Sequence, residues 1–275
     1  MLTNLQVVYL SILQGITEFL PVSSSGHLIL LSKFTNFPDQ GLILDVAVHL
    51  GSILAVMIYF SNYIYDMLVG LWKTRFLPNF KNENAKLFWL LIFGTFPIVI
   101  AGLLLEKYGT EFLRSPKLVG WTILLYGLLL FVADTYSMTI RKINHLGLKD
   151  AFLIGLAQCL SLIPGTSRSG ITITMARFLG MERTEAAKFS MLLSIPAIFG
   201  ATILVCYEAV MEGTNMISSL LLNSITYSFT ASIVAIYIVM KWLKKSTFLP
   251  FVIYRIILGS YLLLDSYGYL NKWLD

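Results

Sequence analysis

The chain has 275 residues, of which 57% are hydrophobic and 13% are charged. Soluble globular domains carry about 25% charged residues, so this composition excludes a soluble protein and indicates a polytopic membrane protein. The net charge of +5 comes without a basic run interleaved with aromatic residues, which argues against a nucleic-acid-binding surface.

In chain order, the sequence predicts two groups of helices, each made of one broken apolar segment followed by three continuous ones. The broken segments, 5–34 and 148–180, are divided by Pro, Gly and Ser into pieces of about 14 residues. Such pieces are too short to cross a bilayer singly, so we expect two re-entrant helical hairpins. The six predicted transmembrane spans are 42–60, 87–105, 118–136, 186–206, 217–240 and 250–270. The expected fold is therefore an all-α polytopic membrane protein.

The odd number of spans between the two hairpins has a topological consequence. Three spans separate them, so the second group should enter the membrane with the opposite orientation. The sequence thus predicts an inverted-topology repeat, with residues 1–140 as the first half and 141–275 as the second. Broken helices at corresponding positions of inverted halves indicate a binding site near the middle of the membrane.

Lysine and arginine residues predict the orientation, because they accumulate in cytoplasmic loops. Thirteen lie in the predicted loops 61–86, 137–149, 177–188 and 241–249. Five lie on the other side, namely Lys33, Lys107, Arg114, Lys117 and Lys272. We therefore expect both termini outside, with the first hairpin entering from the outer face and the second from the cytoplasm.

The first hairpin carries polar side chains that are costly at membrane depth. Gln14 and Glu18 are four positions apart and share one helical face. After Pro21 come Ser23, Ser24, Ser25, Gly26 and His27. An intramembrane carboxylate usually faces a polar cavity and has a function, although Glu18 pairing within the helix bundle is the plainer alternative. The serines, likewise, are also ordinary helix N-cap residues.

The second hairpin repeats this pattern, with an arginine but without the carboxylate and histidine of the first. After Pro164 the chain continues with Gly165, Thr166, Ser167, Arg168, Ser169 and Gly170, and Thr172 follows. Aligning the glycines of the two segments places Arg168 opposite Ser24. Arg168 needs an acidic partner at this depth, either Glu18 or a phosphate. Hydroxyl, carboxylate, imidazole and guanidinium groups together are the set needed for phosphoryl transfer.

Three other groups of polar residues are less informative. His49 lies four positions after Asp45, and we expect a structural polar pair, with a supporting role in the site as the alternative. Arg255 in the last span is expected either to extend to the membrane surface or to bind a lipid head group. Cys159 and Cys206 have no metal or redox spacing and are expected to be packing residues.

The two polar segments resemble the two motifs of a known family. Glu18 to His27 reads EFLPVSSSGH, Gln14 precedes it by four positions, and Pro164 to Thr172 reads PGTSRSGIT. These resemble the motifs of the bacterial undecaprenyl pyrophosphate phosphatases, also called bacitracin-resistance proteins. The likeness covers essentially the whole chain. The family has Glu or Gln at the position of Gln14, so a mechanism that needs two carboxylates there does not fit this sequence.

The resemblance implies hydrolysis of undecaprenyl diphosphate to undecaprenyl phosphate and inorganic phosphate, in the bacterial plasma membrane. This reaction recycles the lipid carrier of peptidoglycan synthesis at the outer face and confers bacitracin resistance. By position, Ser24 is the expected nucleophile, His27 the acid or base or an alternative nucleophile, and Arg168 the diphosphate ligand. Glu18 is expected to position or deprotonate, and to bind a divalent cation such as Mg²⁺ or Ca²⁺. The expected substrate-binding residues are Gln14, Ser23, Ser25, Gly165, Thr166, Ser167, Ser169 and Thr172.

Three rival functions remain open at this point. Inverted repeats with broken helices are also typical of transporters, so a lipid-phosphate flippase is the first alternative. The second is a lipid phosphatase of the acid-phosphatase type, but Thr174 stands where that type requires a second histidine. The third is a scaffold without chemistry.

Overall fold

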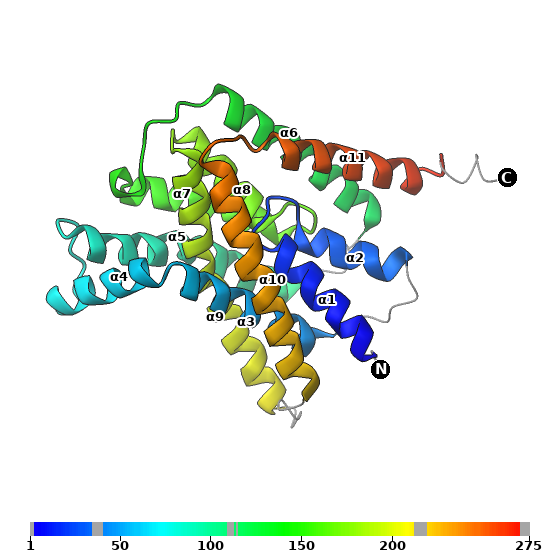
Figure 1. Ribbon diagram of the computed structural model, residues 1–275, viewed down its shortest axis with the longest axis horizontal. Coiled ribbons are helices and arrows are strands. Elements are labelled where there is room, and N and C mark those ends of the chain that lie inside the picture. Colours follow the sequence, from blue (N-terminus) through cyan, green and yellow to red (C-terminus); the bar gives the residue numbers. More distant parts are fainter. Residues whose placement is uncertain (1–2, 35–40, 109–112, 114, 212–218, 270–275) are drawn as a thin grey trace.

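The computed structural model describes the chain except for residues 1–2, 35–40, 109–112, 114, 212–218 and 270–275 (Figure 1). The described part is helical. In chain order, its α-helices are α1 (Asn4–Thr17), α2 (Ser24–Phe34), α3 (Leu42–Tyr59), α4 (Ser61–Lys73), α5 (Glu83–Tyr108), α6 (Pro116–Tyr136), α7 (Leu148–Cys159), α8 (Arg168–Phe178), α9 (Arg183–Met211), α10 (Ser219–Leu243) and α11 (Leu249–Ser266). Short 3₁₀ turns, η2 (Ile143–His145) and η3 (Leu160–Leu162), precede and follow α7.

Five helices of the described part are long and apolar enough to cross a membrane, in agreement with five of the predicted spans. They are Glu83–Leu105, Pro116–Tyr136, Arg183–Tyr207, Ser219–Leu243 and Leu249–Ser266. The start of the predicted span 217–240 and the end of 250–270 lie outside the described residues. The chain therefore is a polytopic membrane protein, as its composition predicts.

The region after the first predicted span differs from the prediction. The helix predicted at 42–60 is present as α3, but it bends by 78° into α4, where the sequence predicts a loop over 61–86. Helix α4 forms because one of its faces packs against α5. Met67, Gly70 and Leu71 are buried on that face. The opposite face leaves Tyr65 and Trp72 mostly exposed, a pattern typical of a helix at the membrane surface.

Each of the two segments predicted to form a hairpin contains two short helices, α1 and α2 in the first and α7 and α8 in the second. Their helices have 14, 11, 12 and 11 residues. At 1.5 Å per residue the longest spans about 21 Å, which is short of the hydrocarbon core of about 30 Å. None of these four helices can cross a bilayer alone. We call α1–α2 the first hairpin and α7–α8 the second hairpin.

The tips of the two hairpins share an unusual backbone geometry. Ser23 and Ser167 have φ angles of 74° and 70°, in the left-handed region that non-glycine residues rarely adopt. Each serine accepts a hydrogen bond at Oγ from a backbone amide three residues later, that of Gly26 or Gly170. The next residue begins a helix in both cases. Ser24 and Arg168 are therefore the first residues of α2 and α8, as the glycine alignment of the two segments predicts.

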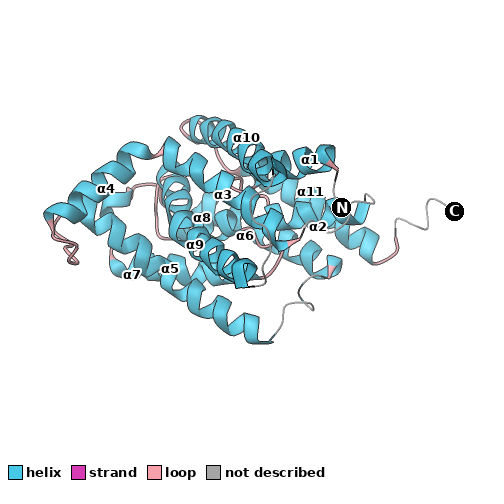
Figure 2. Ribbon diagram, turned by 90° about the horizontal axis from the view of Figure 1, so that it is seen from below, coloured by secondary structure: helices cyan, strands magenta, loops and turns pink. Residues whose placement is uncertain are grey.

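The helices pack closely at small residues. Helix α10 lies along α1 and α3, α6 lies along α11, and α5 lies along α7 (Figures 1 and 2). At the α5–α7 crossing, a Cβ atom added to Gly155 would lie 2.2 Å from the carbonyl oxygen of Gly94. Only glycine permits this approach. Small residues at helix crossings are typical of packing in membranes, where backbone contacts replace the hydrophobic effect.

Arg255 of α11 is buried, contrary to the prediction that it extends to the surface or binds a lipid head group. Its guanidinium donates hydrogen bonds to backbone carbonyl oxygens that belong to α6 and to both hairpin tips. The acceptors are those of Pro21, Thr122, Ile123, Gly165 and Thr166. The prediction is wrong because the broken helices leave carbonyl oxygens at the two tips without intrahelical partners, and the buried guanidinium satisfies them. Arg255 thus joins the two tips to α6.

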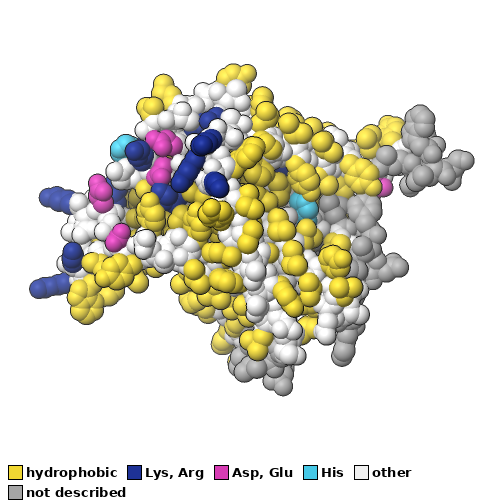
Figure 3. All heavy atoms as spheres, viewed as in Figure 1, with side chains coloured by type: hydrophobic (Ala, Val, Ile, Leu, Met, Phe, Trp, Pro, Cys, Tyr) yellow, Lys and Arg dark blue, Asp and Glu magenta, His cyan; other side chains and the backbone are white. Residues whose placement is uncertain are grey.

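Charged side chains are distributed unevenly over the surface. Figure 3 shows lysine and arginine gathered at the end of the molecule where α4 and α5 meet, whereas hydrophobic side chains cover most of the remaining face. Some of the residues that predict the orientation lie outside the described part of the chain. These are Arg114, Lys272, the side chain of Lys33 and both chain ends.

Candidate active site between the hairpin tips

A cavity of about 360 Å³ lies where the two hairpin tips face α3, α5 and α9. Its polar wall comes from the tips and α3, and its apolar wall from α5 and α9. The lining residues are Glu18, Ser24, Ser25, Asp45, Val46, His49, Ile98, Ser161, Ser167, Arg168, Ala197, Ile198, Ala201, Thr202 and Val205. A cavity with one polar and one apolar wall suits an amphipathic ligand.

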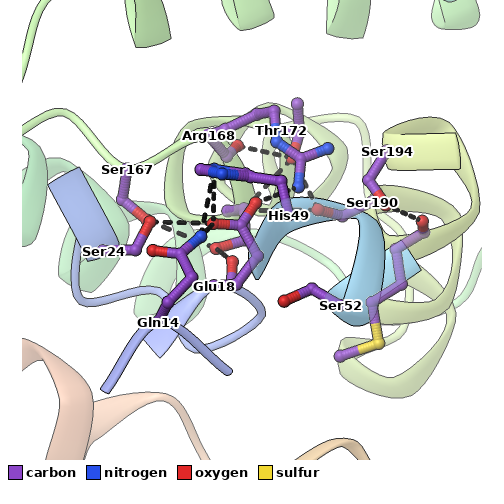
Figure 4. Close-up of polar contacts among 12 residues, drawn as sticks. Gln14, Glu18, Ser24, His49, Ser52, Ser167, Arg168, Thr172, Ser190 and Ser194 are labelled. Atoms are coloured by element: carbon purple, nitrogen blue, oxygen red, sulfur yellow. Dashed lines mark hydrogen bonds and ion pairs between the residues drawn. The ribbon is translucent and has the colours of Figure 1, made fainter. Parts of the chain in front are cut away.

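Glu18 is the centre of the polar wall, and both of its carboxylate oxygens are hydrogen-bonded (Figure 4). Its Oε1 accepts from Arg168 Nη2 at 2.7 Å. Its Oε2 accepts from Ser24 Oγ at 2.8 Å and from Gln14 Nε2 at 2.7 Å. Since the Ser24 hydroxyl donates directly to a carboxylate, the pair has the arrangement of a nucleophile and its general base.

Arg168 brings the second hairpin to this carboxylate. The residue begins α8, so its backbone also lies at a helix N-terminus, where free N–H groups and the helix dipole favour an anion. While Nη2 binds Glu18, the buried Nη1 has no hydrogen-bond partner in the described part of the chain. Arg168 lines the cavity, so its guanidinium has donors beyond the one given to Glu18 with which to bind a phosphate oxygen.

His49 lies closer to the centre of the site than its position in the sequence predicts. His49 contacts Asp45, as expected, through the backbone, since His49 Nδ1 lies 2.7 Å from the Asp45 carbonyl oxygen. Its Nε2 lies 3.0 Å from Gln14 Nε2 and 3.6 Å from Glu18 Oε2. Figure 4 shows the ring above Glu18 and Gln14. The available signal was an intramembrane histidine at the start of a span that follows the first motif.

His27 is not brought to this group. Its Nδ1 lies 2.6 Å from the Ser23 carbonyl oxygen and its Nε2 lies 2.5 Å from the Tyr254 hydroxyl. The His27 and Tyr254 rings stack with a centroid separation of 5.6 Å. His27 is absent from the cavity lining. In this structure both ring nitrogens are engaged away from Ser24, so the predicted acid or base role stays a prediction.

The remaining predicted substrate-binding residues fall into two groups. Ser25 and Ser167 line the cavity. The others hold the tips in place. Ser169 Oγ donates to the carbonyl oxygen of Leu20 at 2.9 Å, which joins the hairpins, and Thr172 Oγ1 lies 2.6 Å from Ser190 Oγ. Gly165 has a φ of 88° and packs so closely that a Cβ atom would lie 2.1 Å from Thr122 Oγ1.

Gln14, Ser23 and Thr166 also support rather than line the cavity. Gln14 is fully buried and reaches the cavity only through Glu18 and His49. Ser23 caps α2, and the Thr166 carbonyl oxygen accepts from Arg255 Nη1 at 3.1 Å. These three residues determine where Glu18, Ser24 and Arg168 lie.

The described residues do not form a site for a resident metal ion. No group of three or more His, Cys, Asp or Glu side chains that could hold one is found among them. Glu18, the predicted ligand, already has one oxygen paired with a cation and the other accepting two hydrogen bonds. A divalent cation would have to displace Arg168 or Ser24 from Glu18.

Fold and site together define a class of protein: a polytopic membrane protein whose broken helices join a hydroxyl, a carboxylate and a guanidinium in one amphipathic cavity. A sequence profile described as Bacitracin resistance protein BacA matches residues 7–261. The chain therefore belongs to the bacitracin resistance protein BacA family.

Relatives of the same length carry one consistent name. The chain is 45% identical to an undecaprenyl-diphosphatase of Hahella chejuensis over 97% of its own length and 99% of the relative's. It is 44% identical to an undecaprenyl-diphosphatase of Alteromonas mediterranea, with 95% and 98% of the two chains covered. It is also 45% identical to an undecaprenyl-diphosphatase 1 of Rhodospirillum rubrum, over 96% and 95%.

Proposed function

We propose that this protein is an undecaprenyl-diphosphatase, an integral membrane hydrolase that converts undecaprenyl diphosphate to undecaprenyl phosphate and inorganic phosphate. The observation that carries the proposal is the contact of Glu18 with both Ser24 and Arg168 in a cavity with one apolar wall. Family membership and the relatives' names agree with it. The reaction recycles the lipid carrier for peptidoglycan synthesis and underlies bacitracin resistance.

The cavity suits both parts of such a substrate. The diphosphate is expected to bind between the N-termini of α2 and α8, with Arg168 Nη1 as a further donor. The prenyl chain is expected to extend along the apolar wall, which includes Ile98 and Ile198, and from there into the surrounding lipid. We expect soluble short-chain diphosphates to be much poorer substrates, because they cannot use that wall.

The proposed reaction has two displacements at the terminal phosphorus. In the first, Ser24 Oγ forms a bond to phosphorus while its proton passes to Glu18 Oε2. The bond to the bridging oxygen breaks, and undecaprenyl phosphate leaves with the bonding electrons. Arg168 stabilises the equatorial phosphate oxygens as their charge redistributes.

In the second displacement, a water molecule attacks the phosphoserine phosphorus and the Oγ–P bond breaks. Glu18 returns its proton to Ser24 Oγ. The released phosphate keeps both hydrogens of the water, so the enzyme recovers its starting state. Each step uses groups that are within hydrogen-bond distance of one another.

We further propose the inverted repeat and orientation that the sequence predicts. The matching φ angles and caps of Ser23 and Ser167 support two equivalent hairpins, and their short helices support re-entrant insertion. The cluster of lysine and arginine in Figure 3 supports a cytoplasmic face at the end of α4. The site would then open to the outer face of the bacterial plasma membrane, with both termini outside. Labelling a Ser24→Cys variant from each side, after replacing Cys159 and Cys206, tests this orientation.

Phosphate release from undecaprenyl diphosphate by the purified protein in detergent tests the activity itself. A flippase cannot transport in detergent, so release by the wild type, and its loss in Ser24→Ala, would favour the phosphatase. Absence of release under every divalent-cation condition would instead favour a lipid-phosphate transporter. A scaffold predicts that Glu18→Ala and Arg168→Ala change nothing.

A further inference from the structure

His49 belongs to neither polar motif, yet it lies in the polar wall of the cavity. About a third of its side chain, 31%, is exposed, whereas the Glu18 side chain beside it is 5% exposed. The ring comes from α3, a helix that is joined to α10 by a contact of 3.0 Å between Ser52 Oγ and Ser228 Oγ. His49 is thus a cavity residue on an element outside both hairpins.

The contacts of the two ring nitrogens define which of them carries hydrogen. The Asp45 carbonyl oxygen can only accept, so Nδ1 at 2.7 Å must be the donor. In the neutral ring, Nε2 then has a lone pair and accepts from Gln14 Nε2 at 3.0 Å. The same amide nitrogen donates its second hydrogen to Glu18 Oε2 at 2.7 Å.

This arrangement fixes the orientation of the Gln14 amide. If the amide were turned over, Gln14 Oε1 would face Glu18 Oε2 and His49 Nε2, and three acceptors would meet without a hydrogen. Gln14 Oε1 has no partner in the described part of the chain, so no other contact selects its orientation. Glu18 Oε2 and the lone pair of His49 therefore together hold the Gln14 donor in this orientation.

The orientation of Gln14 bears directly on the proposed base. Glu18 Oε2 receives hydrogen bonds from only Gln14 and Ser24 among the described residues. With the Gln14 donor in place, Oε2 is held facing Ser24 Oγ while Oε1 remains with Arg168. Displacing a base by about 1 Å can lower a rate by 10²-fold, because proton transfer depends steeply on geometry.

We propose that His49 is a positioning residue for the phosphatase reaction, which acts through Gln14 to hold Glu18 Oε2 toward Ser24. The inference rests on the function proposed above. In this role His49 need not contact the diphosphate. The substrate would bind normally without it, but the carboxylate would be poorly oriented.

Two polar replacements separate positioning from packing. His49→Gln has a side chain long enough to present an acceptor to Gln14, whereas His49→Asn can reach the Asp45 carbonyl oxygen but not Gln14. We expect His49→Asn to lower kcat by ~10-fold or more with KM within about 3-fold, and His49→Gln to restore most of kcat. His145→Asn, an exposed histidine at η2, is the matched control and should retain wild-type kcat. His49→Ser serves as a second shortened variant if His49→Asn does not give monodisperse protein.

A double-mutant cycle with Gln14→Leu tests whether His49 acts through Gln14. If it does, the Gln14→Leu/His49→Asn double variant is no slower than the slower single variant. The proposal would be overturned if the reductions in kcat of the two single variants multiplied in the double variant. It would also be overturned if His49→Gln and His49→Asn lost kcat equally, or if His49→Asn kept wild-type kcat. All rates are compared with an active wild type, so the absence of wild-type activity would contradict the proposed function and not this role of His49.

Discussion

Glu18 and Arg168 are 150 positions apart in sequence, yet Glu18 Oε1 and Arg168 Nη2 lie 2.7 Å apart. The contact joins the end of α1 to the start of α8. It neutralises two charges that would otherwise be expensive inside a membrane. Pairing with Glu18 was the plain alternative to phosphate binding for Arg168, and the geometry is compatible with both, because the contact with Glu18 uses Nη2 and leaves Nη1 without a hydrogen-bond partner in the described part of the chain.

Arg168 variants should therefore separate charge from geometry. We expect Arg168→Ala to lower phosphate release by at least ~100-fold, on the scale of removing a key electrostatic group. Arg168→Lys keeps the charge but offers one ammonium group to both Glu18 and the phosphate. We therefore expect its rate of phosphate release to remain well below that of the wild type. Wild-type kcat/KM in Arg168→Lys would contradict a role for the two separate guanidinium nitrogens. Folding is checked by size-exclusion chromatography in detergent.

Ser24 and His27 should differ in how strongly they affect the reaction. Ser24→Ala removes the hydroxyl that donates to Glu18 and should reduce release to the background of the assay. His27→Gln loses contacts with the Ser23 carbonyl oxygen and Tyr254, which lie away from Glu18. We expect His27→Gln to retain at least ~10-fold more activity than Ser24→Ala. A general acid or base that acts directly contributes 10²- to 10⁴-fold to the rate, and His27 does not contact the Ser24–Glu18 pair in this structure.

Transfer of radioactive phosphate to the protein gives an independent measurement of the same assignment. A phosphoenzyme trapped by rapid acid quench should be phosphoserine and should be absent in Ser24→Ala. Phosphohistidine that disappears in His27→Gln would instead make His27 the nucleophile.

Arg255 should be required for folding more than for chemistry. Replacing it by Met removes the donor from the tip carbonyl oxygens of Pro21, Gly165 and Thr166, at a cost of about 1–3 kcal/mol for each buried group left unsatisfied. We expect Arg255→Met to lower the thermal denaturation midpoint in detergent by several degrees. Lys244→Ala, at an exposed position after α10, is the control. An unchanged midpoint in Arg255→Met would show that the tips are held by other contacts.

A divalent cation should reach the site with the diphosphate rather than through Glu18 alone. Titration of the substrate-free protein with Mg²⁺ or Ca²⁺ should give no saturable heat of binding, because no preformed cluster exists among the described residues. EDTA should lower phosphate release, and added cation should restore it in proportion to the diphosphate present. A one-to-one cation site that disappears in Glu18→Gln would contradict this expectation.

Much of the fold can be predicted from the lengths of the apolar segments. Spans such as 118–136 are recognisable because about 20 apolar residues have no other common explanation, and the structure places a helix at Pro116–Tyr136. Helix α4 was missed because its buried face is narrow and lies within a charged region. Its order depends on contact with α5, for example where Gly70 meets Ala85, and periodicity in one segment does not reveal a distant partner.

The same distinction applies to the site. Ser24 and Arg168 could be placed opposite each other because their segments align residue by residue. The location of His49 could not be predicted, because its neighbours Gln14 and Glu18 come from another helix. The sequence makes His27 as good a candidate for the site as Ser24. In the structure, however, His27 Nε2 contacts the hydroxyl of Tyr254, which is 227 positions away in sequence. Sequence spacing identifies local faces, whereas the choice between two nearby polar residues depends on tertiary packing.

The hydrogen bond from Ser169 Oγ to the Leu20 carbonyl oxygen has a pharmacological consequence. It lies at the seam between the hairpins, behind the residues that would meet substrate. A small molecule that wedges into this seam would separate Arg168 from Ser24 without resembling a diphosphate. An inhibitor of that kind would not compete with the lipid substrate for the groups that bind the diphosphate.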